Sequence, residues 1–512
     1  MQKNFSRREF LNITGLVSAG LALPQWFLKP SAEQPAGGGQ NVLIVLFDSW
    51  SAYHLSLYSY ARRTTPQIER LAERAIVYHN HIAGGNYTLP GTTSLLTGML
   101  SWKHRAFGFP IDQVQNLFAE RNIFHLFPDY HRMAYTHNRL ANQVLEYLFR
   151  DLDDFTPLRQ HLLHDDFWVS NLFAGDDDIA TLSWLRALKP QEADFNYSLF
   201  FSRIYQANLQ RTFLEYDKLF PLGLPRFNID NFYLLEDAID WMIEALPSAP
   251  QPFLGYYHFL PPHYPYNTRA DFYKAFSGDG RAPQRKAESL FSERASYELL
   301  IQEARHYDEF ILYVDSEFAR LYERLEQSGV LNSTWLILTS DHGELFERGV
   351  RGHGGPLLYH PVIKIPLLIF PPGQTTRQDV YENTSAVDLL PTLLEITGRG
   401  DRKPDWTEGQ VLPPFGKESR KDIFVVEGLQ TEQNRPMDSG TIIVLREKYK
   451  LIYYFGYEKL GGMEEMVELY DLDNDPEELE DLALVHADLA ADLLNTAKEK
   501  RAENDRPFLS NG

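Results

Sequence analysis

The sequence predicts an α/β fold with a doubly wound, mostly parallel central sheet, followed by a small C-terminal antiparallel sheet and a helix. Three observations support this prediction. Several apolar, β-branched runs lack polar alternation, which is typical of strands buried on both faces of a parallel sheet. Helix-like stretches separate these runs. After about residue 415 the pattern changes to short strands.

Four apolar runs predict the central strands: 41–47, 253–259, 334–339 and 366–370. Polar residues follow three of them, with Asp48 after the first, His263 shortly after the second and Asp341 after the third. Because ligands bind at the carboxyl ends of strands in doubly wound sheets, we expect these three side chains at one edge of the sheet.

Periodic apolar stretches predict the helices between the strands: 68–75, 94–97, 232–245, 297–327 and 387–397. The C-terminal pattern predicts strands at 422–427, 441–446, 449–455 and 468–470, and a helix at 486–502. Residues 110–235 fit the alternation poorly, and we interpret them as an insertion that shapes a binding pocket. The predicted organisation is therefore a leader at 1–39, an α/β domain at 40–415 and an α+β subdomain at 416–512.

The composition excludes several functional classes. The chain has 512 residues, with 49 Lys and Arg against 70 Asp and Glu, which makes a net charge of −21. Because such a surface repels phosphate polymers, we expect no nucleic-acid partner. Hydrophobic residues make up 44% of the chain, which favours a globular protein over a disordered one. The chain has no cysteine, so disulfides, thiolate metal ligands and cysteine nucleophiles are absent, and nothing in the sequence predicts the oligomeric state.

The first thirty residues have the features of a targeting segment. They carry four basic residues against Glu9, in an otherwise acidic chain. The sequence SRREFL at 6–11 precedes a weakly hydrophobic stretch that contains Pro24, and a Pro- and Gly-rich linker follows at 31–40. This pattern resembles a twin-arginine export signal. We therefore expect the export machinery as a partner and a location on the periplasmic or extracellular face, with an uncleaved signal anchor as the alternative.

Acidic segments are interpreted as surface loops. Residues 464–481 hold ten acids and no base and are predicted to form a solvated loop. Short clusters at 151–154, 165–166 and 176–178 are predicted to be surface loops as well, with calcium binding as the alternative.

Asp48, Asp341 and His342 are oxygen and imidazole donors at strand ends. This donor set suits one divalent ion such as Mn²⁺, Zn²⁺, Ca²⁺ or Mg²⁺, although acids at strand ends also cap helices. A third segment, 86–98, is a polar turn that leads into a short helix, whose free N–H groups can receive an anion. The Thr88 hydroxyl beside a cation would be an activated nucleophile. The alternative for Thr88 is a turn residue or a helix cap.

Eight segments in order resemble the sulfatase-like branch of the alkaline phosphatase superfamily. The resemblance runs from Asn41 to about Leu482. Each segment is weak by itself, whereas eight in family order are specific. The segments are NVLIVLFDSW at 41–50, TLPGTTSLLTG at 88–98, PPHYPY at 261–266, TSDHGE at 339–344, RGHG at 351–354, KIPLLIFPPG at 364–373, SAVDLLPTLLEITG at 385–398 and ELYDLDNDPEELEDL at 468–482.

The resemblance implies a metal set of Asp48, Thr88, Asp341 and His342, with Thr88 as the nucleophile. Two departures qualify the match. Many arylsulfatases have a second acid where this chain has Ser49. Family sulfatases have a Cys or Ser that becomes formylglycine at the Thr88 position, with Ser and Arg where this chain has Gly91 and Thr92, so formylglycine cannot form here. Threonine at this position is instead similar to the phosphoethanolamine and phosphoglycerol transferases.

The motif positions also imply residues that bind the substrate. His263 and His353 are expected to bind an ester oxygen or to protonate the leaving group, and both are therefore candidate catalytic residues. Asn86 and Lys364 are further candidates for substrate binding. Glu344 is expected to orient His342, whereas His258 and His360 are interpreted as core or supporting groups.

Three functions follow as hypotheses. The first is an exported, metal-dependent, sulfatase-like hydrolase that cleaves a phosphate, phosphonate or sulfate ester through a covalent Thr88 intermediate, with phosphorus preferred over sulfur because of the threonine. Its substrate would be a small anionic ester, free or carried on a glycan or lipid. The second is a phosphoryl-alcohol transferase that acts on a surface glycan or lipid, although the membrane-spanning helices usual in those enzymes are not found in this sequence. The third is an inactive exported binding protein.

Overall fold

The computed structural model describes residues 39–163 except 109 and 113, single residues at 204, 207 and 211, and residues 213–511 except 228–230 and 418–419. All of them belong to one compact unit, residues 37–512. The predicted export signal lies outside the described residues, as do the acidic clusters at 165–166 and 176–178. None of the helices in the described part of the chain is both long enough and apolar enough to cross a membrane.

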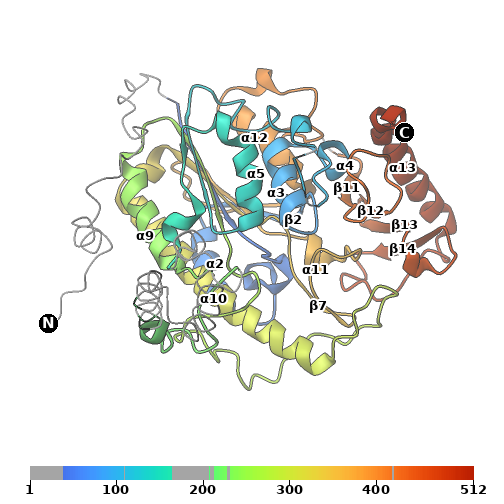
Figure 1. The fold of residues 1–512 in the computed structure, drawn as a ribbon, viewed down its shortest axis with the longest axis horizontal. Coiled ribbons are helices and arrows are strands. Elements are labelled where there is room, and N and C mark those ends of the chain that lie inside the picture. The colour runs from blue at the N-terminus through green and yellow to red at the C-terminus, as the bar shows by residue number, and fades with distance from the viewer. Residues whose placement is uncertain are drawn as a thin grey trace, which may run out of the picture. The chain divides into compact units, whose positions relative to one another are not determined.

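The central sheet has eight strands among the described residues, in the order β10-β2-β9-β6-β1-β5-β3-β4 (Figure 1). Their bounds are β1 (Asn41–Phe47), β2 (Ile76–Ile82), β3 (His131–Thr136), β4 (Asp154–Phe155), β5 (Phe253–Phe259), β6 (Thr334–Thr339), β9 (Leu367–Phe370) and β10 (Gln378–Ser385). Strand β9 pairs antiparallel with β2 and β6, and the other pairings in this sheet are parallel. The predicted mostly parallel sheet is confirmed.

Helices cover both faces of this sheet, as a doubly wound fold requires (Figure 1). They are α2 (Pro66–Ala72), α3 (Thr88–Thr97), α4 (Ser101–His104), α5 (Arg139–Leu148), α9 (Leu235–Ala245), α10 (Tyr297–Gln327), α11 (His360–Ile363), α12 (Leu389–Ile396) and α13 (Ala487–Asp505). Successive side chains of β1 point to opposite faces. Val45 joins the core formed with α2, α9 and α10, whereas Ile44 joins the core formed with α3, α5 and α12. Each such side chain stabilises the fold by about 1.5–3 kcal/mol through burial.

The predicted insertion at 110–235 needs correction. Its first part contains β3 and α5, which belong to the central sheet and to one of its helix layers. The sequence of β3 is HRMAYT, and polar side chains occupy half of its positions. The search for apolar runs therefore did not predict this strand. The side chain of Asn138 caps α5 by accepting hydrogen bonds from Leu140 N and Ala141 N. Residues 164–203 of the range lie outside the described residues.

The C-terminal part forms the predicted small antiparallel sheet, in the order β11-β12-β13-β14. Its strands are β11 (Ile423–Glu427), β12 (Gly440–Arg446), β13 (Tyr449–Phe455) and β14 (Glu465–Asp471). Helix α13 and α4 pack on one face, and the segment with α11 packs on the other (Figure 1).

The acidic segment 464–481 is only partly a solvated loop. Its first part is β14, and Glu478 is fully buried. The Glu478 carboxylate pairs with the Lys450 ammonium and accepts a hydrogen bond of 2.8 Å from His360 N. Through these two contacts, Glu478 connects β13 to the start of α11.

Candidate active site

Strand geometry brings Asp48 and Asp341 together. Strands β1 and β6 are parallel neighbours with Leu46 opposite Thr339, so the residues that follow them meet at one edge of the sheet. After Asp48 the chain turns through Ser49, whose φ of 59° is left-handed. This turn directs Ser49 N to Asp341 Oδ1 at 3.2 Å.

The two carboxylates and His342 form a buried cluster of possible metal ligands, with ligand atoms within 4.8 Å of one another. His342 Nδ1 donates to Gly343 O at 2.9 Å, so Nε2 carries the lone pair that faces the carboxylates. Nε2 lies 3.4 Å from Asp341 Oδ2 and 3.6 Å from Asp48 Oδ1. Neither Asp341 Oδ2 nor His342 Nε2 has a hydrogen-bond partner among the described residues, although both atoms are buried.

These orphaned atoms fit a divalent cation. Burial, together with the neighbouring Asp48 carboxylate, raises the pKa of Asp341 to about 8. Although burial opposes its charge, hydrogen bonding to His258 and the nearby imidazoles hold the pKa of Asp48 well below its usual range. A bound cation would compensate both carboxylates and would use the free imidazole nitrogen.

Thr88 lies directly beside this cluster. It is the first residue of α3, and only 1% of its surface is exposed. Its hydroxyl donates to Asp48 Oδ2 at 3.3 Å and accepts from Asn138 Nδ2 at 3.1 Å. The structure therefore brings together Asp48, Thr88, Asp341 and His342, the four residues predicted for the metal set.

Sequence reasoning missed Asn138 and ranked His258 too low. Besides capping α5, Asn138 donates through Nδ2 to both Asp48 Oδ2 and Thr88 Oγ1. His258 Nε2 lies 3.1 Å from Asp48 Oδ2, and its Nδ1 lies 3.1 Å from Tyr256 Oη. Both residues are buried. His258 is near the carboxyl end of β5, which pairs with β1, and Asn138 follows β3, the next strand of the sheet. The available signal was the polar residue at a strand end, the same signal that identified Asp48.

Gly91 is where α3 meets the loop that follows β6. A Cβ atom at Gly91 would come within 2.5 Å of the Asp341 backbone oxygen. The serine that family sulfatases carry at this position therefore has no room in this backbone. The neighbouring Thr92 is buried. It occupies the position of the family arginine, so this chain has no guanidinium there.

His353 and His263 form a second group beside the cluster of Asp48, Asp341 and His342. Strands β7 (Leu345–Glu347) and β8 (Val350–Gly352) make a hairpin between Glu344 and His353. His353 Nδ1 lies 2.9 Å from Glu344 Oε1, so Glu344 orients His353, whereas sequence analysis expected it to orient His342. Burial lowers the pKa of His353, but the Glu344 carboxylate outweighs this and raises it. The His353 ring centroid is 4.2 Å from that of His342 and 5.1 Å from that of His263.

The two remaining substrate-binding candidates lie in different settings. Asn86 is buried, and its Nδ2 donates to Gly355 O at 2.8 Å, which holds the loop after His353. Lys364 directly follows α11, and its ammonium lies 5.8 Å from the Tyr53 ring centroid. Burial lowers the pKa of Lys364 to about 8.

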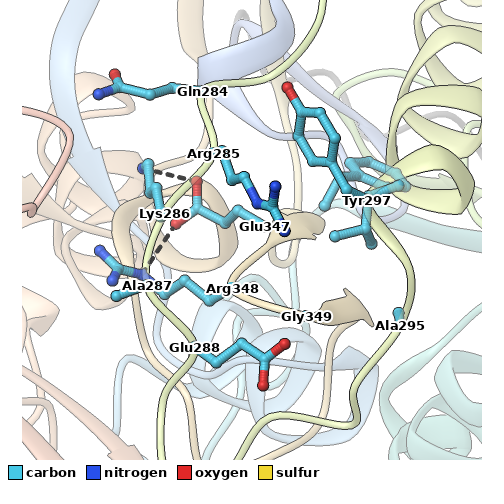
Figure 2. Close-up of a pocket in the computed structure, with 12 residues that line it drawn as sticks. Gln284, Arg285, Lys286, Ala287, Glu288, Ala295, Tyr297, Glu347, Arg348 and Gly349 are labelled. Atoms are coloured by element: carbon cyan, nitrogen blue, oxygen red, sulfur yellow. Dashed lines mark ion pairs between the residues drawn. The ribbon is translucent and has the colours of Figure 1, made fainter.

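The pocket in Figure 2 is separate from these residues. It has a volume of about 260 Å³ and is lined by the turn of the β7–β8 hairpin and by residues 284–288. Lys286 pairs with Glu347 at 2.6 Å inside it, and Arg285 lines the same pocket. Because these charges largely compensate one another, the pocket does not define a ligand, and the chemistry resides at the other end of the hairpin.

Fold and cluster together define an α/β protein with a buried cluster of possible metal ligands and an adjacent threonine hydroxyl. Comparison with known proteins gives the family. The Sulfatase family model matches residues 40–144 and 181–399. A second model, N-sulphoglucosamine sulphohydrolase, C-terminal, matches residues 354–503. The chain belongs to the sulfatase family, and is accordingly a sulfatase-like hydrolase that acts on ester bonds.

Individual relatives have low sequence identity to this chain, and their matches cover between about half and nine tenths of its length. The multifunctional alkaline phosphatase superfamily protein PehA of Trinickia caryophylli is 23% identical over 87% of this chain and 91% of its own length. The endo-4-O-sulfatase of Bacteroides thetaiotaomicron is 25% identical over 46% of this chain and 48% of its own length. The crystal structure of the phosphonate monoester hydrolase of Agrobacterium radiobacter superposes with a TM-score of 0.61, at 20% identity, over 91% of this chain and 96% of that chain. The last likeness confirms the fold.

Proposed function

We propose that this chain is an exported, metal-dependent hydrolase that cleaves a phosphate or phosphonate ester through a covalent Thr88 intermediate. One observation carries the proposal. The Thr88 hydroxyl lies in a buried site between Asp48 Oδ2 and Asn138 Nδ2, beside the unpartnered Asp341 Oδ2 and His342 Nε2. A turn residue or a simple helix cap would not need this surrounding, and Thr88 is the first residue of α3 rather than its cap.

Asp48, Thr88, Asp341 and His342 would hold the divalent ion, which when bound supplies positive charge to the ester oxygens. The Thr88 oxygen attacks phosphorus, and its proton leaves toward Asp48 Oδ2, the acceptor it already faces. A Thr–O–P bond forms as the bond from phosphorus to the alcohol oxygen breaks. His353, held by Glu344 through Nδ1, delivers its Nε2 proton to the departing alkoxide.

Hydrolysis of the intermediate uses the same residues in reverse. His353, now neutral at Nε2, accepts a proton from water as the water oxygen attacks phosphorus. The Thr–O–P bond breaks, and the Thr88 oxygen recovers a proton from the side of Asp48. The products are the free acid and the alcohol, and Thr88 is restored. Asn138 stabilises the Thr88 oxygen in both steps because its Nδ2 donates to it at 3.1 Å.

Phosphorus is preferred over sulfur for two reasons. Threonine supplies an ordinary alkoxide rather than the hydrated aldehyde of formylglycine. In addition, the Agrobacterium neighbour is named a phosphonate monoester hydrolase. Sulfate esters are the second candidate, because the family model and the endo-4-O-sulfatase carry that name.

The test begins with the metal content of the purified mature protein. Release of nitrophenol is then measured from phosphate monoester, phosphodiester, phosphonate and sulfate substrates. One divalent ion with phosphoester or phosphonate turnover supports the proposal. Sulfate turnover would move the substrate preference to sulfur. A protein with neither metal nor turnover would favour an inactive binding protein.

Hydrolysis and transfer are separated by product analysis. With a soluble alcohol present, a hydrolase releases the free phosphate or phosphonate, whereas a transferase joins the group to the added alcohol. We propose hydrolysis, and a new ester as the main product would contradict it. Carriage of the substrate on a glycan or lipid is tested with the same esters attached to oligosaccharides and to vesicles.

Export is proposed from residues 1–30 alone. Replacing Arg7 and Arg8 with lysine should retain the full precursor in the cytoplasm if the segment is a twin-arginine signal. The measurement is fractionation of cells that express the wild-type chain and the double variant. Equal export of both would contradict this assignment without affecting the catalytic proposal.

A further inference from the structure

A tyrosine and an arginine extend the site beyond the two histidines. Tyr264 directly follows His263, and Arg351 lies on β8, two residues before His353. The Arg351 guanidinium carbon is 4.8 Å from the Tyr264 ring centroid. The His263 and His353 ring centroids are 5.1 Å apart, so the Tyr264–Arg351 pair, one and two residues away along the chain, lies near the two histidines.

The Tyr264–Arg351 pair is exposed to solvent, unlike the buried stacked arginine Arg348. The Tyr264 ring belongs to a residue that is 46% exposed, and the Arg351 side chain is 36% exposed. By contrast, the Arg348 side chain, stacked on Tyr359 at 4.0 Å, is only 7% exposed and donates to the Glu478 carbonyl. Tyr264 and Arg351 are therefore accessible to a ligand.

Arg351 also has unused hydrogen-bonding capacity. Its one ion pair in the described part of the chain joins Nη1 to Glu303 Oε1 at 3.4 Å. That distance is longer than a charge-assisted hydrogen bond, and the contact engages one of five N–H donors. The remaining fork can bind a carboxylate, sulfate or phosphate group. In a chain with a net charge of −21, such local positive charge is what an anionic substrate needs.

We infer that Tyr264 and Arg351 bind the alcohol part of the ester and select alcohols in which a ring carries a second negative charge. The ring packs on the exposed part of Tyr264, and the anionic group accepts hydrogen bonds from Arg351. This inference rests on the proposed function, because it places the alcohol at the histidines. It names the substrate class as an anionic ring alcohol, such as an acidic sugar, esterified at the group that Thr88 attacks.

The test compares two phosphate monoesters that differ at one carbon, glucuronic acid 1-phosphate and glucose 1-phosphate. The metal-loaded full chain should show a kcat/KM ratio of about ten in favour of the acidic sugar, the value of one charge-assisted hydrogen bond. Arg351→Gln should bring this ratio to about one while leaving glucose 1-phosphate within about threefold. Glu303→Gln should raise the ratio, because it frees the guanidinium.

Two variants serve as controls. Arg351→Lys keeps the charge but loses the fork, so an intermediate ratio is expected. Arg285→Gln removes another guanidinium that lies near a tyrosine ring, 5.5 Å from the Tyr297 centroid, in the pocket of Figure 2. It should leave the ratio unchanged. An unchanged ratio in Arg351→Gln, or an equal loss in Arg285→Gln, would overturn the inference.

Failure of the proposed function gives a different result. If the wild-type chain turns over none of the nitrophenyl esters, the catalytic proposal fails, and the subsite is then tested by calorimetric binding of methyl glucuronide and methyl glucoside. The inference expects tighter binding of the glucuronide in the wild-type chain and loss of that preference in Arg351→Gln. Equal affinity for both glycosides in the wild-type chain would overturn it.

Discussion

The two halves of the site are built in different ways. Asp48, Thr88, Asp341 and His342 follow strands or open a helix, and they are at most 1% exposed. His263, Tyr264 and Arg351 lie on a loop and a hairpin and are partly exposed. A buried set that hydrogen bonds hold in place suits chemistry shared by a family, whereas an open set suits recognition of a particular alcohol.

The largest effect should come from Thr88. Thr88→Ala removes the attacking oxygen, so kcat should fall by about 1,000-fold or more. Binding of the divalent ion, measured by calorimetry, should persist through Asp48, Asp341 and His342. Thr88→Ser is the matched control, since it keeps the hydroxyl and should retain turnover. Full activity in Thr88→Ala would remove the covalent intermediate from the mechanism.

His353 tests the boundary between the two halves. His353→Gln removes the acid that protonates the alcohol, which should lower kcat by about 100- to 10,000-fold for an alkyl ester. The loss should be much smaller for a nitrophenyl ester, whose leaving group needs no proton. The comparison of the two esters is the measurement. Equal losses for both would show that His353 binds the substrate without acting as the acid.

Asn138 and His258 test how the buried half is held. His258→Gln removes a partner of Asp48 and should weaken metal affinity by about 10- to 100-fold. Asn138→Ala should lower kcat over a similar range, because both Thr88 and Asp48 lose a donor. A metal titration and steady-state kinetics on each variant separate these effects. Unchanged metal affinity in His258→Gln would reduce that residue to a packing role.

The smallest effect on catalysis, but a clear one on stability, is expected from Glu478. Glu478→Gln leaves Lys450 buried without its carboxylate, which should cost about 3 kcal/mol of unfolding free energy. Burial raises the pKa of Glu478, but Lys450 and His360 outweigh it and lower the pKa. Because the folded pKa is depressed, the wild-type pair contributes stability at neutral pH and loses it as pH falls below about 4.5, the unfolded value.

Urea unfolding of wild type and Glu478→Gln at several pH values measures this contribution. The difference between the two proteins should shrink as the pH falls. Glu432→Gln, which breaks an exposed pair with Arg435, is the matched control and should change stability by less than about 1 kcal/mol. A constant difference at all pH values would contradict the assigned pKa direction.

Much of the central sheet and of the proposed metal-ligand set could be predicted from the sequence. Strands β1, β5 and β6 were predicted because they are mostly apolar, and the polar residues Asp48, His263 and Asp341 after them marked the edge of the sheet. The antiparallel direction of β9 was not readable, since a short buried run looks the same in both directions. Helix α3 begins at Thr88 although the prediction started at residue 94, because Pro90 and Gly91 have poor helix propensity and tertiary packing overrides it.

The missed site residues have a common physical cause. Asn138 looks like an ordinary helix cap, and only the position of β3 two strands away from β1 brings its amide to Thr88. His258 lies inside an otherwise apolar strand, where a histidine is usually a core residue with satisfied hydrogen bonds. The role of Lys364 in substrate binding stays a prediction. Its ammonium lies 5.8 Å from the Tyr53 ring centroid.

The contact at Gly91 has a consequence for the engineering of this chain. Since a Cβ there would strike the backbone of Asp341, any larger side chain at position 91 requires α3 and the loop after β6 to move apart. Replacing Thr88 alone with cysteine would leave Gly91 and Thr92 at the two positions where family sulfatases carry serine and arginine. Any variant that places a serine at position 91 therefore needs a compensating shift of the backbone at Asp341.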